Sequence, residues 1–349
     1  MTQSEYHPLV SVLLPIRNES GCIEDCLGAI LAQDYDPDRM EILIADGMST
    51  DTTRLRIDAF STSHPQAKIR ILDNPGKIVP TGLNIALQHA RGEVIIRVDG
   101  HTIIATDYVR QCVEVLRTSG ADNVGGRMDA IGINRFGSAV ALATSTPFGI
   151  GGGRFHFSEK EEWVDTVYMG AWPRRVFDKI GLFDEELVRD QDDEFNYRLR
   201  EGGGKILLSP KIRSEYTVRD IPRSLWWQYY QYGFWKVRVL QKHPLQMSVR
   251  QYVPFVFVLL VFFSSVLVMS PALRLWSLFV PLLYAVTNLA ASTTTVTKKG
   301  WEHLPFLPLV YAILHVSYGL GFLRGLLKFW NRWNDKIGKV PNFYNETSG

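Results

Sequence analysis

The sequence predicts an α/β domain built on a mostly parallel sheet, followed by α-helical transmembrane segments. Residues 9–125 alternate short apolar runs with helix-like stretches, which is typical of βαβ units. Residues 250–349 contain three long apolar runs and carry nine basic but only three acidic side chains. The whole chain of 349 residues has a net charge of +2 and no compact basic patch, so nucleic acid is excluded as a partner.

The elements of the first part follow from this alternation in chain order. Strands are predicted over Leu9–Leu14, Glu41–Ala45, Ile69–Leu72 and Val94–Val98, and helices over Gly21–Ala32, Thr52–Ser61, Pro80–Ala90 and Tyr108–Arg117. Right-handed crossovers bring the carboxyl ends of parallel strands to one edge of the sheet, where ligands of open α/β sheets bind. We therefore expect the functional residues in the loops after these strands.

Residues 126–218 are less periodic. They contain a Gly-rich loop at Phe148–Phe155 and a strongly acidic helix over Asp190–Glu201. Gly202–Gly204 is expected to end that helix, and Lys205–Leu208 to resume as a strand.

Three apolar runs are long enough to cross a bilayer: Val253–Ser270, Trp276–Thr293 and Leu304–Leu323. The first two are predicted to form a helical hairpin, and the third is either another span or a re-entrant helix. Basic residues before the first run place that side in the cytoplasm. A full third span would export the basic C-terminal tail, against the same rule, so the sequence leaves this topology open.

The helix-like segment Ser224–Gln241 is dense in Trp and Tyr and ends near Lys236 and Arg238. We interpret it as an interfacial helix at the lipid headgroups rather than an ordinary amphipathic core helix. The predicted domains are thus a catalytic domain at 1–218, the interfacial region at 219–250, transmembrane helices at 251–330 and a basic tail at 331–349.

Three cysteines, Cys22, Cys26 and Cys112, are too few for a disulfide scaffold. Without a second Cys pair or a nearby His pair they are interpreted as small apolar residues in a reducing compartment. The N-terminus has no signal-peptide pattern, so we expect the first domain in the cytoplasm.

The segment Asp99–His101 (Asp-Gly-His) follows the predicted strand Val94–Val98. In an extended chain, a carboxylate and an imidazole two residues apart point to the same side. This arrangement suits a divalent cation, Mg²⁺ or Mn²⁺, that is held partly by phosphates. The alternative is an Asp that merely caps a turn.

Similar loops follow two other strands. Asp46 is placed to hydrogen-bond a base or ribose, whereas Asp51 is more simply the N-cap of the next helix. Pro15–Glu19 follows the first strand, and Arg17 or Lys77 is placed to face a diphosphate.

Four carboxylates lie within five residues at Asp190–Glu194. They are either a solvated helix start, where the helix dipole favours acids, or they include a general base. Spacing alone does not choose among the four.

Taken together and in order, these motifs resemble the family 2 glycosyltransferases, which have the GT-A fold. The resemblance covers about residues 9–240. It rests on four segments: Val10–Glu19 (VSVLLPIRNE), Ile44–Thr53 (IADGMSTDTT), Gly82–His101 and Gly170–Arg200. The layout, with its C-terminal apolar tail, further resembles the succinoglycan-type glucosyltransferases of exopolysaccharide synthesis.

The resemblance implies a role for each matching position. The residues expected to bind the nucleotide sugar are Pro15, Glu19, Asp46, Lys77, Asp99 and Gly100, with Asp46 on the uracil. Asp99 and His101 are expected at the metal, and Asp192 is expected to be the catalytic base. The acceptor side is assigned to Trp172, Asp193 and Gln228, although Trp172 is equally well a core residue.

The sequence departs from the family pattern at two positions. His101 replaces the second Asp of Asp-x-Asp, which changes the metal's donor set. Gln191 replaces the Glu before the base, which removes a negative charge and is expected to lower the base's pKa. The Gln-x-x-Arg-Trp signature of processive synthases is missing, which favours addition of one sugar per encounter.

The resemblance therefore implies an inverting, metal-dependent enzyme that moves a sugar, expected to be glucose, from a UDP-sugar to a hydroxyl of a polyprenyl-diphosphate-linked saccharide. It would work at the inner (plasma) membrane as a multi-pass protein among membrane lipids, with the catalytic domain on the cytoplasmic side. One alternative is a polyprenyl-phosphate glycosyltransferase that loads the carrier lipid itself. Another is a non-catalytic membrane scaffold with a degenerate transferase domain.

Overall fold

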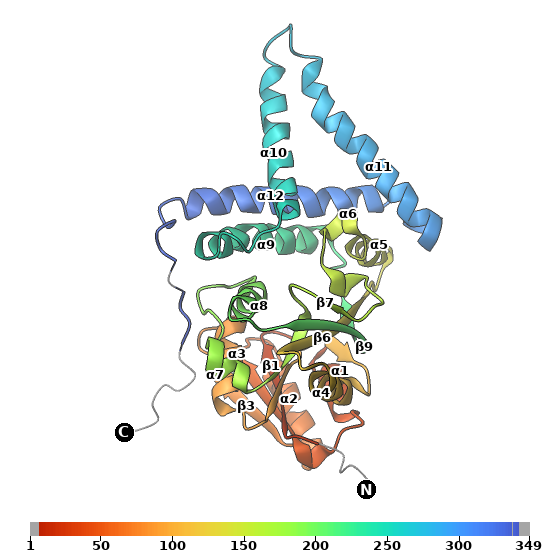
Figure 1. Cartoon of the computed structure of the whole chain (residues 1–349). Coiled ribbons are helices and arrows are strands. Elements are labelled where there is room, and N and C mark those ends of the chain that lie inside the picture. The colour runs from red at the N-terminus through yellow and green to blue at the C-terminus, as the bar shows by residue number, and fades with distance from the viewer. Residues whose placement is uncertain (1–6, 337, 342–349) are drawn as a thin grey trace. The chain divides into compact units, whose positions relative to one another are not determined.

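The computed structural model describes residues 7–336 and 338–341 (Figure 1). The chain divides into two compact units. The first holds residues 7–129, 157–216 and 338–341, and the second holds residues 130–156 and 217–336. The segment 130–156, which falls within the range expected for the catalytic domain, belongs to the second unit.

The first unit is built on a nine-stranded sheet. Its parallel part has the order β3-β2-β1-β4, formed by Ile69–Asp73, Met40–Asp46, Val10–Ile16 and Val94–Arg97. The order continues through β8, β6, β9 and β5, and β7 pairs with β9. The bounds of these strands are Tyr168–Pro173 (β8), Asn123–Ile131 (β6), Ile206–Thr217 (β9), Thr102–Ile104 (β5) and Glu162–Trp163 (β7). The α/β sheet is confirmed, and its parallel part is β1–β4. The pairs β4–β8, β6–β8, β5–β9 and β7–β9 are antiparallel, consistent with the loss of βαβ periodicity in that region.

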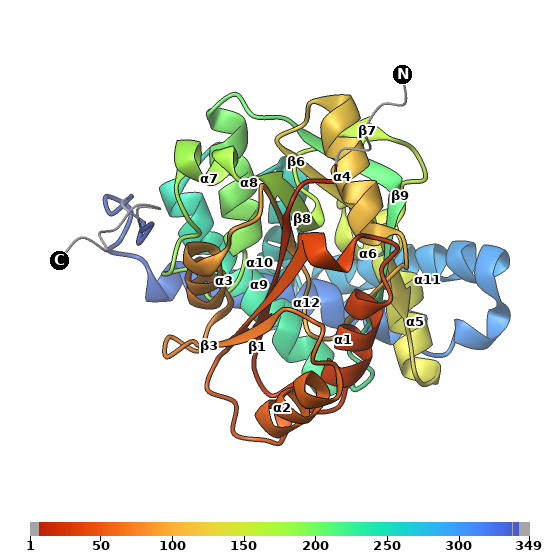
Figure 2. The same cartoon turned by 90° about the horizontal axis from the view of Figure 1, so that it is seen from below.

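Helices cover both faces of this sheet (Figure 2). One face carries α1, α2 and α4, and the other carries α3, α7 and α8. Their bounds are Ile23–Leu31, Thr53–Ser63, Tyr108–Ser119, Val79–His89, Arg175–Ile180 and Gln191–Glu201. Every residue of β1 and β2 is buried, because a parallel strand with helices on both faces has no solvent side.

The predicted boundaries agree with these elements to within a few residues, with one larger difference. The strand expected over Lys205–Leu208 is the longer β9, Ile206–Thr217. Its second half alternates buried and exposed side chains, with polar residues on the exposed side, so it lacks the continuous apolar run of its first half.

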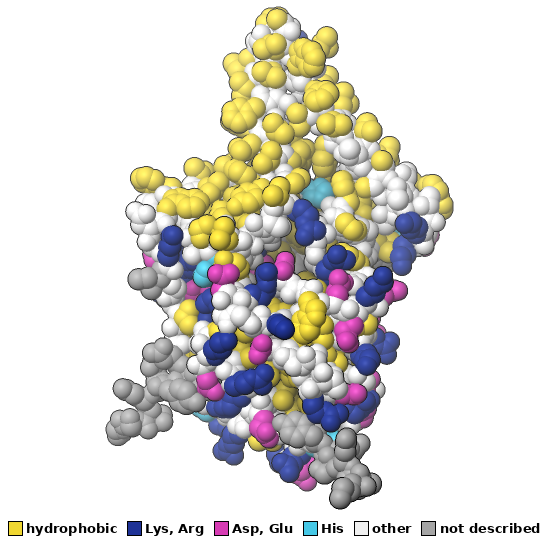
Figure 3. All heavy atoms as spheres, viewed as in Figure 1, with side chains coloured by type: hydrophobic (Ala, Val, Ile, Leu, Met, Phe, Trp, Pro, Cys, Tyr) yellow, Lys and Arg dark blue, Asp and Glu magenta, His cyan; other side chains and the backbone are white. Residues whose placement is uncertain are grey.

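The second unit is helical. It contains α5, α6, α9, α10, α11 and α12, which span Arg135–Thr144, Pro147–Ile150, Pro222–Lys242, Val249–Leu267, Phe279–Lys299 and Leu307–Lys328. Three described segments are long and apolar enough to cross a membrane: Val249–Leu267, Trp276–Lys299 and Leu307–Lys328. They correspond to the three predicted runs. Figure 3 shows hydrophobic side chains covering the surface of α10 and α11.

The third of these helices differs from the other two in its packing. Half of the apolar stretch of α12 is buried within the protein, against 11% for α10 and 17% for the α11 segment. Helix α12 lies beside α9, and glycines let the two backbones touch: a Cβ on Gly233 would overlap the Tyr318 carbonyl, and one on Gly321 would overlap the Tyr230 carbonyl. The protein itself therefore supplies much of the apolar environment of α12.

Two basic side chains of α9 are not where the sequence suggested. Lys236 and Arg238 were expected at the lipid headgroups, but their exposed fractions are 2% and 0%. Arg238 donates to Gln241 (Nη1 to Oε1, 2.7 Å), pairs with Asp335 at 3.6 Å and lies over the Phe329 ring. Arg238 thus holds the segment that follows α12 against α9, and both side chains are buried, so the headgroup interpretation fails for them.

The start of the Gly-rich loop is held by the apolar helices of the same unit. The His315 ring on α12 contacts the Phe148 carbonyl through Nε2 at 2.8 Å and the Tyr284 hydroxyl of α11 through Nδ1 at 3.0 Å. Both ring nitrogens are thus used in packing α6 against α11 and α12.

Candidate active site

The predicted site residues of the first unit lie where the parallel strands end. The register pairs Ile16 of β1 with Asp46 of β2, and Leu13 of β1 with Arg97 of β4. Glu19 therefore follows β1, Asp46 ends β2 and Asp99 follows β4, all at one edge of the sheet. This is the edge at which ligands of open α/β sheets bind.

Asp46 is fully buried and its carboxylate is already oriented. It accepts hydrogen bonds from the Ser49 hydroxyl at 2.6 Å and the Ser49 amide at 3.1 Å, and Arg54 lies 3.5 Å away. Pro15 is buried in β1. Lys77 lies exposed in the turn after β3, which is tied to β2 by the Asn74 amide on the Asp46 carbonyl at 2.9 Å.

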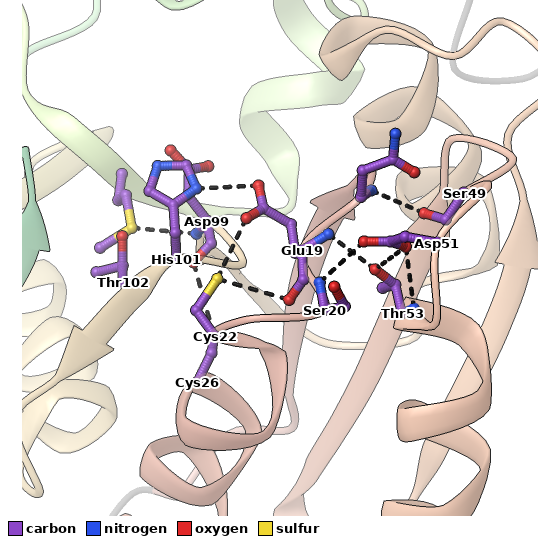
Figure 4. Close-up of polar contacts among 12 residues, drawn as sticks. Glu19, Ser20, Cys22, Cys26, Ser49, Asp51, Thr53, Asp99, His101 and Thr102 are labelled. Atoms are coloured by element: carbon purple, nitrogen blue, oxygen red, sulfur yellow. Dashed lines mark hydrogen bonds and ion pairs between the residues drawn. The ribbon is translucent and has the colours of Figure 1, made fainter. Parts of the chain in front are cut away.

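The loop after β1 is fixed by the loop after β2 (Figure 4). The Glu19 amide donates to the Thr53 hydroxyl at 2.8 Å, and that hydroxyl donates to Asp51 at 2.6 Å. Asp51 also accepts from the Ser20 amide at 3.3 Å. These contacts lower the pKa of exposed Asp51 to about 2, the largest share coming from the Thr53 hydroxyl. The N-cap of α2 is Thr52, and not Asp51 as the sequence had suggested; Asp51 lies one residue earlier, accepts from the Thr53 amide at 3.0 Å and also positions Glu19.

Asp99 is held by an arginine two residues before it. Arg97 donates from Nε to Oδ1 at 2.8 Å and from Nη2 to Oδ2 at 3.2 Å, and both side chains are largely buried. Burial raises the pKa of the Asp99 carboxyl, but the charges of Arg97 and His101 outweigh it, so the net pKa is lowered. Asp99 is therefore ionised, with much of its charge already balanced.

His101 is oriented by Glu19. Its Nδ1 lies 3.1 Å from Glu19 Oε1, and its ring meets Tyr216 edge-on at a centroid distance of 5.4 Å. The other carboxylate oxygen of Glu19 accepts from the Cys22 thiol at 3.2 Å. Cys22 is partly exposed, whereas Cys26 and Cys112 are buried as predicted.

Asp192 lies in the first turn of α8 and is partly buried. Burial raises the pKa of its carboxyl above the usual range, although the Arg97 guanidinium opposes the rise; the charge of Asp193 adds to it. Because Gln191 is uncharged, we expected it to lower the pKa of Asp192. The effect of burial is larger, and the pKa is raised. The negative charges of Asp99 and Asp192 both raise the pKa of Arg97, so one guanidinium interacts electrostatically with both carboxylates.

Backbone strain gathers around the same residues. The described non-glycine residues with left-handed φ are Asn18, Met48, Lys77, Met169 and Asp190. Asn18 precedes Glu19, Met48 follows Asp46, and the sulfur of Met169 accepts from the Asp99 amide at 3.3 Å. Such conformations cost free energy and cluster at functional sites, which supports the assignment of this edge.

Other predicted positions lie elsewhere. Trp172 is 4% exposed and packs against Phe177, Phe183 and Phe195, so it is a core residue. Gln228 belongs to α9 in the second unit, where its amide donates to the Tyr232 hydroxyl at 3.0 Å. Asp193 follows Asp192 on α8 and donates its amide to that carboxylate at 2.9 Å.

Sequence reasoning missed Arg97. The available signal was a lone arginine in the apolar strand Val94–Val98, because a charge in a buried strand needs a partner. Arg189 was also missed; its charge contributes to the lowered pKa of Asp99.

The donor set fits a divalent metal only in part. Among the described residues, no group of three or more His, Cys, Asp or Glu side chains is placed to hold a metal ion. Asp99 and His101 offer one carboxylate and one imidazole. Mg²⁺ and similar ions are often bound by one or two side chains together with phosphate oxygens and water, so this pair suits a metal that arrives with a diphosphate.

The fold and this edge site define a GT-A type of transferase. Residues 11–181 match the model of the family "Glycosyl transferase family 2", so this part of the chain belongs to glycosyltransferase family 2.

Two relatives match nearly the whole chain. The succinoglycan biosynthesis protein ExoA of Rhizobium meliloti is 27% identical over 324 residues, which cover 92% of this chain and 96% of that protein. A Methanococcus voltae enzyme, dolichyl N-acetyl-alpha-D-glucosaminyl phosphate 3-beta-D-2,3-diacetamido-2,3-dideoxy-beta-D-glucuronosyltransferase, is 26% identical over 325 residues, covering 91% and 97%.

Among solved structures, the mannosyltransferase PcManGT from Pyrobaculum calidifontis, in complex with GDP-Man and Mn²⁺, superposes with a TM-score of 0.60. The identity is 18%, and the match covers 91% of this chain and 88% of that one. This likeness establishes the GT-A fold.

Proposed function

We propose that this glycosyltransferase moves a sugar from a UDP-sugar to a hydroxyl of a polyprenyl-diphosphate-linked saccharide, with inversion, in exopolysaccharide or cell-surface glycan synthesis. The observation that carries the proposal is Asp192, a partly buried carboxylate with a raised pKa that shares Arg97 with Asp99. The two acids have opposite pKa shifts, which favours different roles for them.

Asp192 serves as the general base. A pKa raised above the usual carboxyl range makes the Asp192 carboxylate a stronger proton acceptor than an ordinary aspartate. It takes the proton of the acceptor hydroxyl as that oxygen forms a bond to the anomeric carbon. The bond from the anomeric carbon to the UDP oxygen breaks on the opposite face, so the configuration inverts.

The nucleotide sugar lies along the strand ends. Asp46, already oriented by Ser49, accepts from the base, and exposed Lys77 faces the diphosphate. Asp99 and His101 would hold the metal with that diphosphate. When bound, a divalent metal would neutralise negative charge on the departing UDP.

The acceptor is proposed to be lipid-linked because of the second unit. Helices α10 and α11 are proposed to cross the inner (plasma) membrane as a hairpin, whereas α12 lies along α9 without a full crossing. This keeps the basic C-terminal tail on the cytoplasmic side and removes the topology conflict in the sequence. The name of the Methanococcus relative describes transfer onto a lipid-linked sugar, which also supports a hydroxyl acceptor.

The test is transfer from a panel of radiolabelled UDP-sugars, glucose included, into membrane lipid, with and without EDTA. The proposal predicts label in a lipid-linked saccharide, through a linkage of inverted configuration, and its loss in EDTA. Label attached directly to polyprenyl phosphate would instead identify a carrier-loading enzyme. No transfer from any donor by folded protein would support the scaffold alternative.

A further inference from the structure

We propose that Glu19 is a positioning residue that turns His101 into a metal ligand through Nε2 and thereby makes the site favour Mn²⁺ over Mg²⁺. This inference rests on the proposed function, because it concerns the metal of the same site. It also gives Glu19 a role different from the nucleoside contact that the family resemblance implied.

The first step is the tautomer of His101. An ionised carboxylate only accepts hydrogen bonds, so the 3.1 Å contact between Glu19 Oε1 and His101 Nδ1 places the ring proton on Nδ1. In the neutral ring, Nε2 then carries the free lone pair. A carboxylate behind a histidine in this manner is the arrangement that orients metal-binding imidazoles.

The second step is the rigidity of Glu19. Its amide is fixed by Thr53, its carbonyl accepts from the amides of Cys22 and Ile23 at 3.1 and 3.0 Å, and its second carboxylate oxygen accepts from the Cys22 thiol. Figure 4 shows Glu19 between His101 and Cys22. The side chain is therefore aimed at the imidazole by the loop that carries it.

The third step is the close fit at Gly100. A Cβ there would lie 2.8 Å from Ile16 Cγ2 and 3.3 Å from Glu19 Cγ. The glycine between Asp99 and His101 thus leaves room for the stem of Glu19, which lets the carboxylate stand beside the imidazole.

The fourth step is the charge of the donor set. The positive charge of Arg97 balances the negative charge of Asp99, and the Glu19 carboxylate contacts His101. The His101 imidazole therefore contributes a large share of the protein's affinity for the metal ion. Imidazole nitrogen is a better donor to transition metals than to Mg²⁺, which prefers oxygen. A second Asp at position 101 would make the site more suitable for Mg²⁺.

The experiment measures Mn²⁺ binding to the full-length protein by electron paramagnetic resonance in the presence of UDP, with Mg²⁺ as competitor. We expect Mn²⁺ to be favoured by at least about tenfold and its signal to show coupling to an imidazole nitrogen. Glu19→Ala should weaken Mn²⁺ binding about 10–100-fold. Glu19→Gln should keep the nitrogen coupling, because its amide oxygen still accepts from Nδ1.

Two further variants complete the design. His101→Asp should abolish the nitrogen coupling and reduce the preference for Mn²⁺. Glu24→Ala is the matched control, since Glu24 is an exposed acid of α1 that pairs with Arg56 instead of His101, and it should bind Mn²⁺ like the wild type.

Unchanged Mn²⁺ affinity in Glu19→Ala, or no nitrogen coupling in the wild type, would overturn the inference. These readouts require no sugar transfer. The expected binding pattern in a protein that transfers no sugar would support the inference while contradicting the proposed function.

Discussion

Arg97 and Asp99 form a bidentate ion pair inside the sheet edge, with Nε to Oδ1 at 2.8 Å and Nη2 to Oδ2 at 3.2 Å. The same guanidinium acts on Asp192, so it connects the proposed donor side with the proposed base. This pair organises the charges of the site.

Replacing Arg97 tests that role. Arg97→Met should lower stability by about 3 kcal/mol, because Asp99 is left as a buried charge without its main partner. Arg97→Lys should cost less, since it keeps the charge but loses the planar, two-point contact. Melting curves in detergent measure this. Arg91→Met, at an exposed arginine, is the control, and an equal loss there would contradict the account.

The pKa of Asp192 gives a stability prediction. Its folded-state pKa is raised, so the folded protein holds that proton more tightly than the unfolded chain, and stability is lost as pH rises through the folded pKa. Asp192→Asn should therefore melt at a higher temperature than the wild type at neutral pH, with the difference shrinking as the pH falls. Melting temperatures measured across a pH series test this. A lower melting temperature for the variant at neutral pH would oppose the predicted sign.

The close packing at Gly100 gives a prediction on a single methyl group. Gly100→Ala should reduce sugar transfer at least about tenfold by pushing Glu19 and Ile16 away from their places. Gly28→Ala, in α1 with nothing within 4 Å of the added carbon, should leave transfer unchanged. The initial rates of sugar transfer by the two purified variants test this prediction. Equal rates would mean that the close fit at Gly100 is unimportant for transfer.

The contact of α9 with α12 should be equally intolerant of added volume. Gly321→Leu should separate the two helices and lower the melting temperature in detergent by several degrees, because the backbone of Tyr230 occupies the space. Ala285→Leu, on the exposed side of α11, should have little effect. A tolerant Gly321 would show that the two helices do not pack closely in solution.

Local sequence pattern predicted the parallel half of the sheet well. The strands β1, β2 and β4 are mostly apolar, and polar residues follow each of them, so both the strands and the binding edge could be found. The antiparallel half was harder, because β6 and β9 depend on partners far apart in the chain. The packing of α12 on α9 could not be predicted either, since an apolar helix has the same sequence pattern whether it packs against lipid or against protein.

Within the site, the sequence identified residue types but not their partners. Glu19 and His101 are 82 positions apart, and only the fold brings them together. Arg97 was overlooked because strand periodicity says nothing about what a buried arginine binds. Trp172 remained ambiguous between groove and core until the aromatic cluster around it was seen.

The most direct test of the central claim is the rate of sugar transfer by Asp192→Asn. If Asp192 is the general base, kcat should fall at least about 100-fold while UDP-sugar binding is retained. The control, Glu201→Gln at the exposed end of the same helix, should keep the wild-type rate. An Asp192→Asn enzyme that transfers sugar to a hydroxyl acceptor at the wild-type rate would contradict the account.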